Sequence, residues 1–122
     1  MAETGWTWPT ARVVEVHDGD TLKLDVDVGF STHAYAWIRL LNVRAPELSE
    51  GDGAKARADV LTWLAEYAPD SRVQLITYRS SQPLEIRFRQ SFTRYLGVVT
   101  ATAPPVELNE WLRAKGWIDR GA

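Results

Sequence analysis

A strict alternation of apolar and charged residues over residues 22–28 constrains the fold more than any other feature of the sequence. Four aliphatic residues alternate there with three charged ones: Leu22, Leu24, Val26 and Val28 with Lys23, Asp25 and Asp27. A period of two is typical of a half-buried strand, because successive side chains of a strand point to opposite faces of the sheet. The segment therefore predicts a strand with one face in a core.

The rest of the chain predicts further strands and two helices around this one. An apolar run over 13–16 and a segment over 34–41 are expected to be strands, separated from the central one by turns, and 42–53 reads as a loop. Apolar residues over 56–67 recur with helical spacing until Pro69. Strands follow over 73–78 and 92–100, with alternating residues over 84–88 between them. Pro104-Pro105 then opens a second helix that ends before Gly116.

This order of elements favours a mainly β protein of the α+β class. Three strands, a helix, two or three strands and a second helix fit a partly open antiparallel barrel with two flanking helices. A parallel sheet is not expected, because alternating strand–helix units are missing. The 122 residues form a single expected domain, 1–122, and the 45% of hydrophobic residues, with six Trp, can fill its interior.

Composition also narrows the classes of function. The absence of Cys excludes disulfides and thiolate metal sites. No secretory signal and no run of about 18 apolar residues are present, so a soluble cytoplasmic protein is expected. The net charge of −2 argues against tight binding to long DNA, because such binders usually carry a basic surplus. It does not argue against a cleft that holds one phosphate with a few local cations.

Two aspartates come at the point where the chain turns into the alternating strand. Asp18 and Asp20 flank Gly19, and Thr21 follows. A D-G-D triplet is commonly a plain turn, because Gly accepts positive φ and Asp bonds to its own backbone. In the functional interpretation, the two carboxylates at i and i+2 point the same way and gather oxygen ligands for a hard cation such as Ca²⁺.

Three further charged residues are candidates for chemistry. Arg39 lies within the apolar segment 38–41. It is either a strand-edge residue whose side chain reaches water, or an arginine whose planar guanidinium is held rigidly toward a phosphate. Glu47 follows Pro46, which stiffens the loop, although a loop glutamate is commonly just solvated. Arg94 is the third candidate and also lies beside strand residues.

The order of these motifs resembles the staphylococcal nuclease (thermonuclease) family. D-G-D-T is followed by I-R-L-L and A-P-E, then by a helix rich in Gly and Ala, by R-Y-L-G, and by L-N-E-W-L-R-A-K-G-W. The similarity extends from about Arg12 to Asp119. It implies a five-stranded OB-fold barrel and metal-dependent hydrolysis of phosphodiester bonds in DNA or RNA, preferably single-stranded.

The resemblance also implies roles for particular residues. Asp20 corresponds to a Ca²⁺ ligand, and Arg39 and Arg94 correspond to the arginines that hold the phosphate. Glu47 corresponds to the general base, or at least to the group that orients the attacking water. A cation and two guanidinium groups would stabilise the charge that grows on the phosphoryl oxygens.

The sequence departs from the family in three respects. Arg44 occupies the position of a usual Asp or Asn that supports the metal, so either its side chain swings into solvent or the site binds Ca²⁺ poorly. Thr93 replaces a usual Gly, and a Lys-Tyr pair that some members use on the terminal phosphate is absent. The chain also lacks the third helix of longer members.

Two alternatives to a nuclease stay open on the sequence alone. The same barrel could serve as a catalytically weak or inactive module that binds nucleic acid or protein, as Arg44 and the acidic pI suggest. The chain could also be a subunit of a larger assembly that binds its partner through Trp6 and Trp8. An N-terminal strand that packs on the barrel also explains both residues.

Overall fold

The computed structural model describes residues 5–78 and 94–119. The elements within this part of the chain are, in order, β1 (Gly5–Val16), β2 (Thr21–Gly29), β3 (Thr32–Leu40), α1 (Gly53–Tyr67), β4 (Arg72–Tyr78), β5 (Arg94–Thr100) and α2 (Leu108–Ala114). The predicted sequence of strands and helices is therefore confirmed. The alternating residues 84–88 and the predicted start of the last strand at Phe92 lie outside the described residues.

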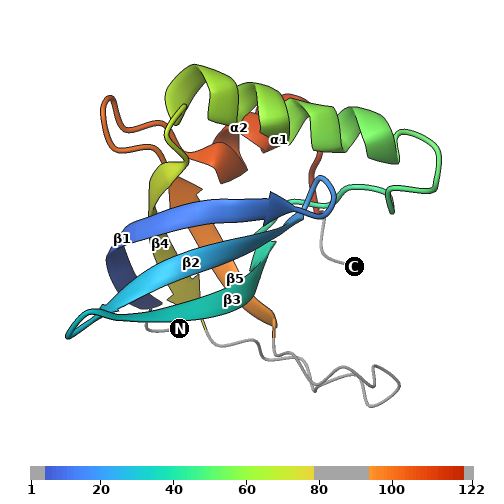
Figure 1. The fold of residues 1–122 in the computed structure, drawn as a ribbon. Helices are drawn as coiled ribbons and strands as arrows, with labels where there is room; N and C mark the ends of the chain where they lie inside the picture. The colour runs from blue at the N-terminus through green and yellow to red at the C-terminus, as the bar shows by residue number, and fades with distance from the viewer. Residues whose placement is uncertain (1–4, 79–93, 120–122) are drawn as a thin grey trace, which may run out of the picture.

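The five described strands form a closed barrel in the order β1-β2-β3-β5-β4. Four of the neighbouring pairs are antiparallel, and β3 and β5 are parallel, with Ile38 opposite Tyr95. The predicted five-stranded, OB-fold-like α+β class is confirmed. The expectation of a partly open antiparallel barrel was wrong, because the barrel is closed and β3 pairs with β5 in parallel. In Figure 1 both helices lie together on one side of the barrel.

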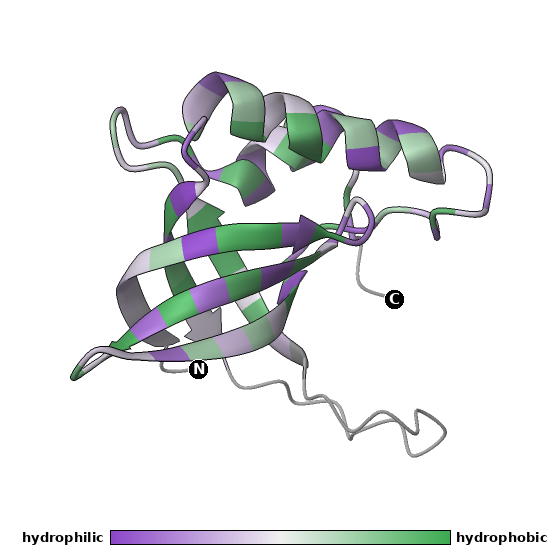
Figure 2. Ribbon diagram, viewed as in Figure 1, coloured by the Kyte–Doolittle hydropathy of each residue, from purple (hydrophilic) through white to green (hydrophobic). Residues whose placement is uncertain are grey.

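The alternation in β2 builds one wall of the barrel interior. Leu22, Leu24 and Val26 are buried, whereas Lys23 and Asp25 on the opposite face are partly exposed. Green and purple bands alternate along β2 in Figure 2 for this reason. Val28 departs from the pattern and is 38% exposed, because it lies beside the turn that joins β2 to β3. Burial of apolar side chains on the inner face is the main favourable term in folding.

The helices cover the barrel through apolar side chains at the predicted positions. Ala56, Val60 and Trp63 of α1 are fully buried, and Leu64 and Tyr67 pack against the core. In α2, Leu108 and Leu112 are fully buried. The core is thus a single cluster that includes both the barrel interior and the facing sides of the helices.

Helix α2 begins later than its two prolines predict. Glu107 is its N-cap and accepts a hydrogen bond from the backbone N–H of Glu110 at 3.1 Å. The preceding residues form a loop closed by the hydrogen bond from the Ala101 N–H to the Val106 carbonyl, so the prolines stay outside the helix. Gly116 follows the C-cap with a φ of +104°, as predicted, in the left-handed region that favours glycine.

The N-terminal segment is part of the barrel. Strand β1 pairs with both β2 and β4, and the indole N–H of Trp8 donates to the Thr77 hydroxyl at 3.0 Å. The prediction of an N-terminal strand that packs on the barrel is confirmed, although Trp6 stays half exposed. Neither helix within the described ranges has the length and apolar character needed to cross a membrane.

Candidate functional site

The turn between β1 and β2 buries two carboxylates at one end of the barrel. The Asp20 N–H donates to Asp18 Oδ1 at 3.0 Å, and the His17 N–H donates to the Thr21 carbonyl at 3.1 Å. The side chains of Asp18 and Asp20 are only 6% and 11% exposed. The turn interpretation is thus confirmed, and the same turn holds two buried acidic groups close together.

Gly19 is required in this turn because of close packing and not because of its φ angle. Its φ is not positive, so the reason expected from the sequence was wrong. A Cβ at this position would lie 2.5 Å from the Cβ of Ala56 in α1 and 2.6 Å from that of Ala45. The absence of a side chain therefore lets the turn contact both the helix and the loop that follows β3.

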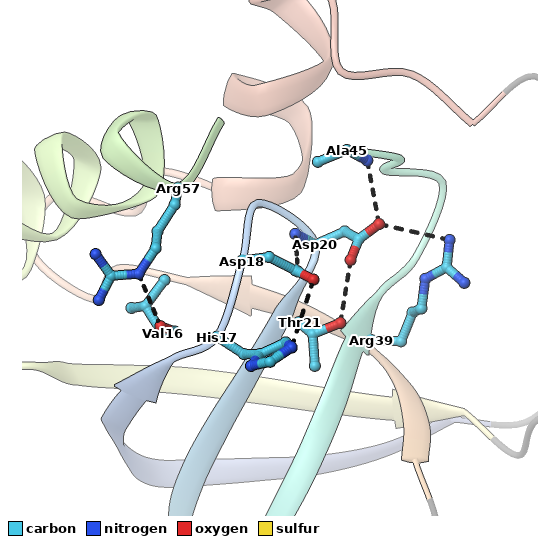
Figure 3. Close-up of polar contacts among 8 residues, drawn as sticks. All are labelled: Val16, His17, Asp18, Asp20, Thr21, Arg39, Ala45 and Arg57. Carbon is cyan, nitrogen blue, oxygen red and sulfur yellow. Dashed lines mark hydrogen bonds and ion pairs between the residues drawn. The ribbon is translucent and has the colours of Figure 1, made fainter. Parts of the chain in front are cut away.

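Asp20 connects the D-G-D-T turn to the A-P-E loop. Its Oδ2 accepts a hydrogen bond from the Ala45 N–H at 3.1 Å, and its Oδ1 accepts one from the Thr21 hydroxyl at 3.0 Å (Figure 3). Burial raises the pKa of Asp20 above its ordinary value, and the neighbouring Asp18 carboxyl raises it further; the Ala45 N–H and Arg39 act in the opposite direction. The site therefore disfavours the negative charge of Asp20 when no cation is present.

Arg39 lies in the middle of the sheet, since β3 pairs with β2 on one side and β5 on the other. Its Nη2 is 3.6 Å from Asp20 Oδ2 and 4.0 Å from Asp119 Oδ2. The Nε is buried and has no hydrogen-bond partner within the described residues. The strand-edge interpretation of Arg39 was therefore wrong: the guanidinium is held between two carboxylates, about one third exposed, at the wall of the cavity.

The loop after β3 places Glu47 opposite the aspartates. The Glu50 N–H donates to the Glu47 carbonyl at 2.9 Å, and the Gly53 N–H donates to the Glu50 carbonyl at 2.8 Å at the start of α1. A Cβ at Gly53 would collide with the Glu47 carbonyl, so the helix start packs directly on this loop. Glu47 is exposed, and its carboxylate lies within 4.8 Å of ligand atoms of His17 and Asp18.

These residues line one open cavity of about 540 Å³. Its lining brings together Asp18, Asp20, Arg39 and Glu47, the four predicted site residues whose side chains the structure describes, and adds the following: Arg44, Ala45, Pro46, Glu50 and Ile118. Four carboxylates and two guanidinium groups give this lining a net charge of −2. One divalent cation would neutralise this charge.

Two supports outside the cavity fix its walls. Arg57 of α1 donates from its Nε to the Val16 carbonyl at 3.1 Å and so holds the chain just before the turn. Asn109 of α2 is fully buried; its Nδ2 donates to the carbonyls of Leu41 and Gly97, and its Oδ1 accepts from the Val99 N–H. The chain therefore leaves β3 toward Arg44 and Glu47 in a fixed direction.

The residues present fit a metal ion in part. Asp18 belongs both to the predicted pair with Asp20 and to a cluster with His17 and Glu47 that was not predicted. Carboxylate oxygens suit Ca²⁺ or Mg²⁺, whereas an imidazole ligand favours a transition metal. His17 directly precedes Asp18, so its position next to the acidic pair was a signal in the sequence that could have found it.

Arg44 and Arg94 differ in how much of each residue the structure describes. Arg44 is exposed but still lines the cavity, and no ion pair of its side chain is found within the described residues. Of Arg94 the structure describes the backbone, which lies opposite Trp37 at the start of β5. Its side chain lies outside the described part, so its contact with a phosphate stays a prediction.

Comparison with known proteins identifies no family for this chain. No protein-family model matches the sequence, and a search of curated proteins finds no significant match.

Proposed function

We propose that the protein is a metal-dependent nuclease that hydrolyses phosphodiester bonds of DNA or RNA. One observation carries the proposal: Asp18, Asp20, Arg39 and Glu47, which come from three separate segments of the chain, line the same open cavity. Two buried carboxylates can hold a cation, an arginine can stabilise charge on a phosphoryl oxygen, and an exposed glutamate can activate water, which together suit hydrolysis of a phosphodiester. The cavity lining carries a net charge of −2, which one divalent cation would balance.

Each residue has a role that follows from its position. Arg39 is pre-positioned by Asp20 and Asp119, so its remaining N–H groups are available to a phosphate oxygen without reorganisation. Glu47 is exposed at the cavity wall and would orient or deprotonate the attacking water. Asp18 and Asp20 would hold the cation, proposed as Ca²⁺, which supplies charge stabilisation on the phosphoryl oxygens when bound. Arg94 would be a second phosphate contact.

A second function is favoured by one specific observation. Both carboxylate oxygens of Asp20 already accept hydrogen bonds, and Arg39 lies 3.6 Å from one of them. With Arg44 also at the cavity, the aspartate is partly satisfied without a metal. These contacts support a module that binds a nucleic-acid phosphate or a protein without hydrolysing it.

Incubation of the purified protein with single-stranded DNA and RNA separates the two functions. We expect cleavage that stops in EDTA and returns with Ca²⁺, Mg²⁺ or Mn²⁺. A folded protein, judged by circular dichroism, that binds the strands but cleaves them with none of these ions would support the binding module and overturn the nuclease.

A further inference from the structure

The outer face of β3 carries two aromatic side chains in line with Arg39. Tyr35, Trp37 and Arg39 alternate with Ala36 and Ile38, which line the interior, so the three share the outer face. Tyr35 is 65% exposed, and Trp37 is half-buried. Side chains on one face of a strand follow at about 6.6 Å, a spacing similar to that of successive nucleotides in an extended single strand. The two rings therefore form a row that leads to the cavity.

Lys23 of β2 places a positive charge between the two rings. Its Nζ lies 5.7 Å from the ring centre of Trp37 and 5.8 Å from that of Tyr35, in the range of cation–π contacts. The His17 and Trp37 rings lie nearly perpendicular with their centres 6.0 Å apart, and His17 Nε2 lies 3.9 Å from Asp18 Oδ2. The surface formed by Tyr35, Trp37 and Lys23, here called the aromatic track, is thus continuous with the candidate site.

We propose that the aromatic track binds bases of a single-stranded nucleic acid next to the phosphate held in the cavity. The inference rests on the proposed function and extends it to the substrate's adjacent nucleotides. Bases stack on exposed aromatic rings whatever their sequence, and neighbouring cations attract the phosphates between them. Bases in a duplex are already stacked on each other and do not reach such rings, so the track selects single strands.

Charge sets the length of the track. From Tyr35 outward the same face becomes acidic: Asp25 lies opposite Tyr35 and contacts His33 at 2.8 Å, and the exposed Asp27 lies opposite His33. These carboxylates repel further phosphates, whereas Lys23 and Arg39 attract those near the cavity. The track therefore accommodates about two nucleotides beside the bound phosphate, a number that follows from its two rings, one base to each. Affinity should rise with oligonucleotide length only up to this limit.

The test measures binding in EDTA, so that it does not depend on cleavage. Fluorescence anisotropy would compare short oligo-dT strands with abasic strands of equal length, for the wild type and for Tyr35→Ala and Trp37→Ala. Tyr35→Phe keeps the ring, and Phe30→Ala removes a fully exposed ring at the β2–β3 turn, away from the track. Circular dichroism and thermal denaturation would check that every variant folds.

We expect each alanine variant on the track to weaken oligo-dT binding about tenfold, a typical loss for a base-stacking ring. Binding of abasic strands should change much less, and Tyr35→Phe and Phe30→Ala should bind oligo-dT like the wild type. If folded Tyr35→Ala and Trp37→Ala bind oligo-dT as the wild type does, or if the wild type does not prefer oligo-dT to abasic strands, the track is overturned. Base-dependent binding without any cleavage would keep the track and reject the nuclease.

Discussion

Replacement of Arg44 changes the charge of the cavity beside Asp20 without touching the barrel core. Arg44 provides one of the two positive charges in the cavity lining. At about 6 Å and an effective dielectric near 20, one guanidinium repels a divalent ion by about 5.5 kcal/mol. Arg44 is exposed, so solvent and salt screen most of this repulsion, and about 1.4 kcal/mol is a conservative expectation, which is tenfold in Kd.

We therefore expect Arg44→Gln to tighten Ca²⁺ binding about tenfold, and Arg44→Asp to tighten it further because a carboxylate is added beside Asp20. Calorimetric titration with Ca²⁺ at low and high salt measures both effects, and the gain should shrink at high salt. Cleavage at low Ca²⁺ should become faster in parallel. The metal-free Arg44→Asp protein should be less stable, because carboxylates that cluster repel each other.

Arg72→Gln is the matched control for these variants. Arg72 is exposed at the start of β4 and lies 3.8 Å from Asp70, so the substitution changes the net charge equally but outside the cavity lining. Ca²⁺ affinity should stay at the wild-type value in this protein. An equal gain in Arg72→Gln and Arg44→Gln, or no gain in either Arg44 variant, would refute the placement of Arg44 at the metal position.

Three further substitutions test the site from other directions. Arg39→Ala should lower kcat about 10²-fold or more, the scale for loss of one transition-state donor, in single-turnover cleavage. Gly53→Ala should displace the Glu47 carbonyl and lower kcat, with a loss of about 1–3 kcal/mol of stability in denaturant titration. Asp20→Asn should abolish Ca²⁺ binding but stabilise the metal-free protein at pH 7, because the pKa of Asp20 is raised. In thermal denaturation that advantage should disappear as the pH falls toward 3.8, where wild-type Asp20 is protonated too.

Local periodicity made much of the fold predictable. The alternation over 22–28 gives the inward face of β2, and the helical spacing of Ala56, Val60 and Trp63 gives the buried side of α1. Each pattern reflects which side chains face the core, and so it can be recognised from a few neighbouring residues. Asp20, Arg39 and Glu47 lie at one cavity, and no local pattern indicates this, since they come from separate segments; only the order of motifs led to the expectation.

Contacts between distant segments were not predictable in the same way. The parallel pairing of β3 with β5 joins strands that have α1 and β4 between them, and no local pattern encodes it. The packing of Gly19 against Ala45 and Ala56 likewise depends on how three segments meet. The proximity of His17 to Asp18 is visible in the sequence, but its proximity to Glu47 arises only from the folded loop.

The most direct test of the account is the cleavage rate of single-stranded DNA in Ca²⁺ by the wild type and by Glu47→Gln, purified side by side. The two proteins differ only at the cavity wall, so a contaminating nuclease would be present equally in both. We predict metal-dependent cleavage by the wild type and a rate at least about 10²-fold lower in Glu47→Gln, with oligonucleotide binding retained. Equal rates in the two proteins, or no cleavage by either while both are folded, would contradict a nuclease centred on this cavity.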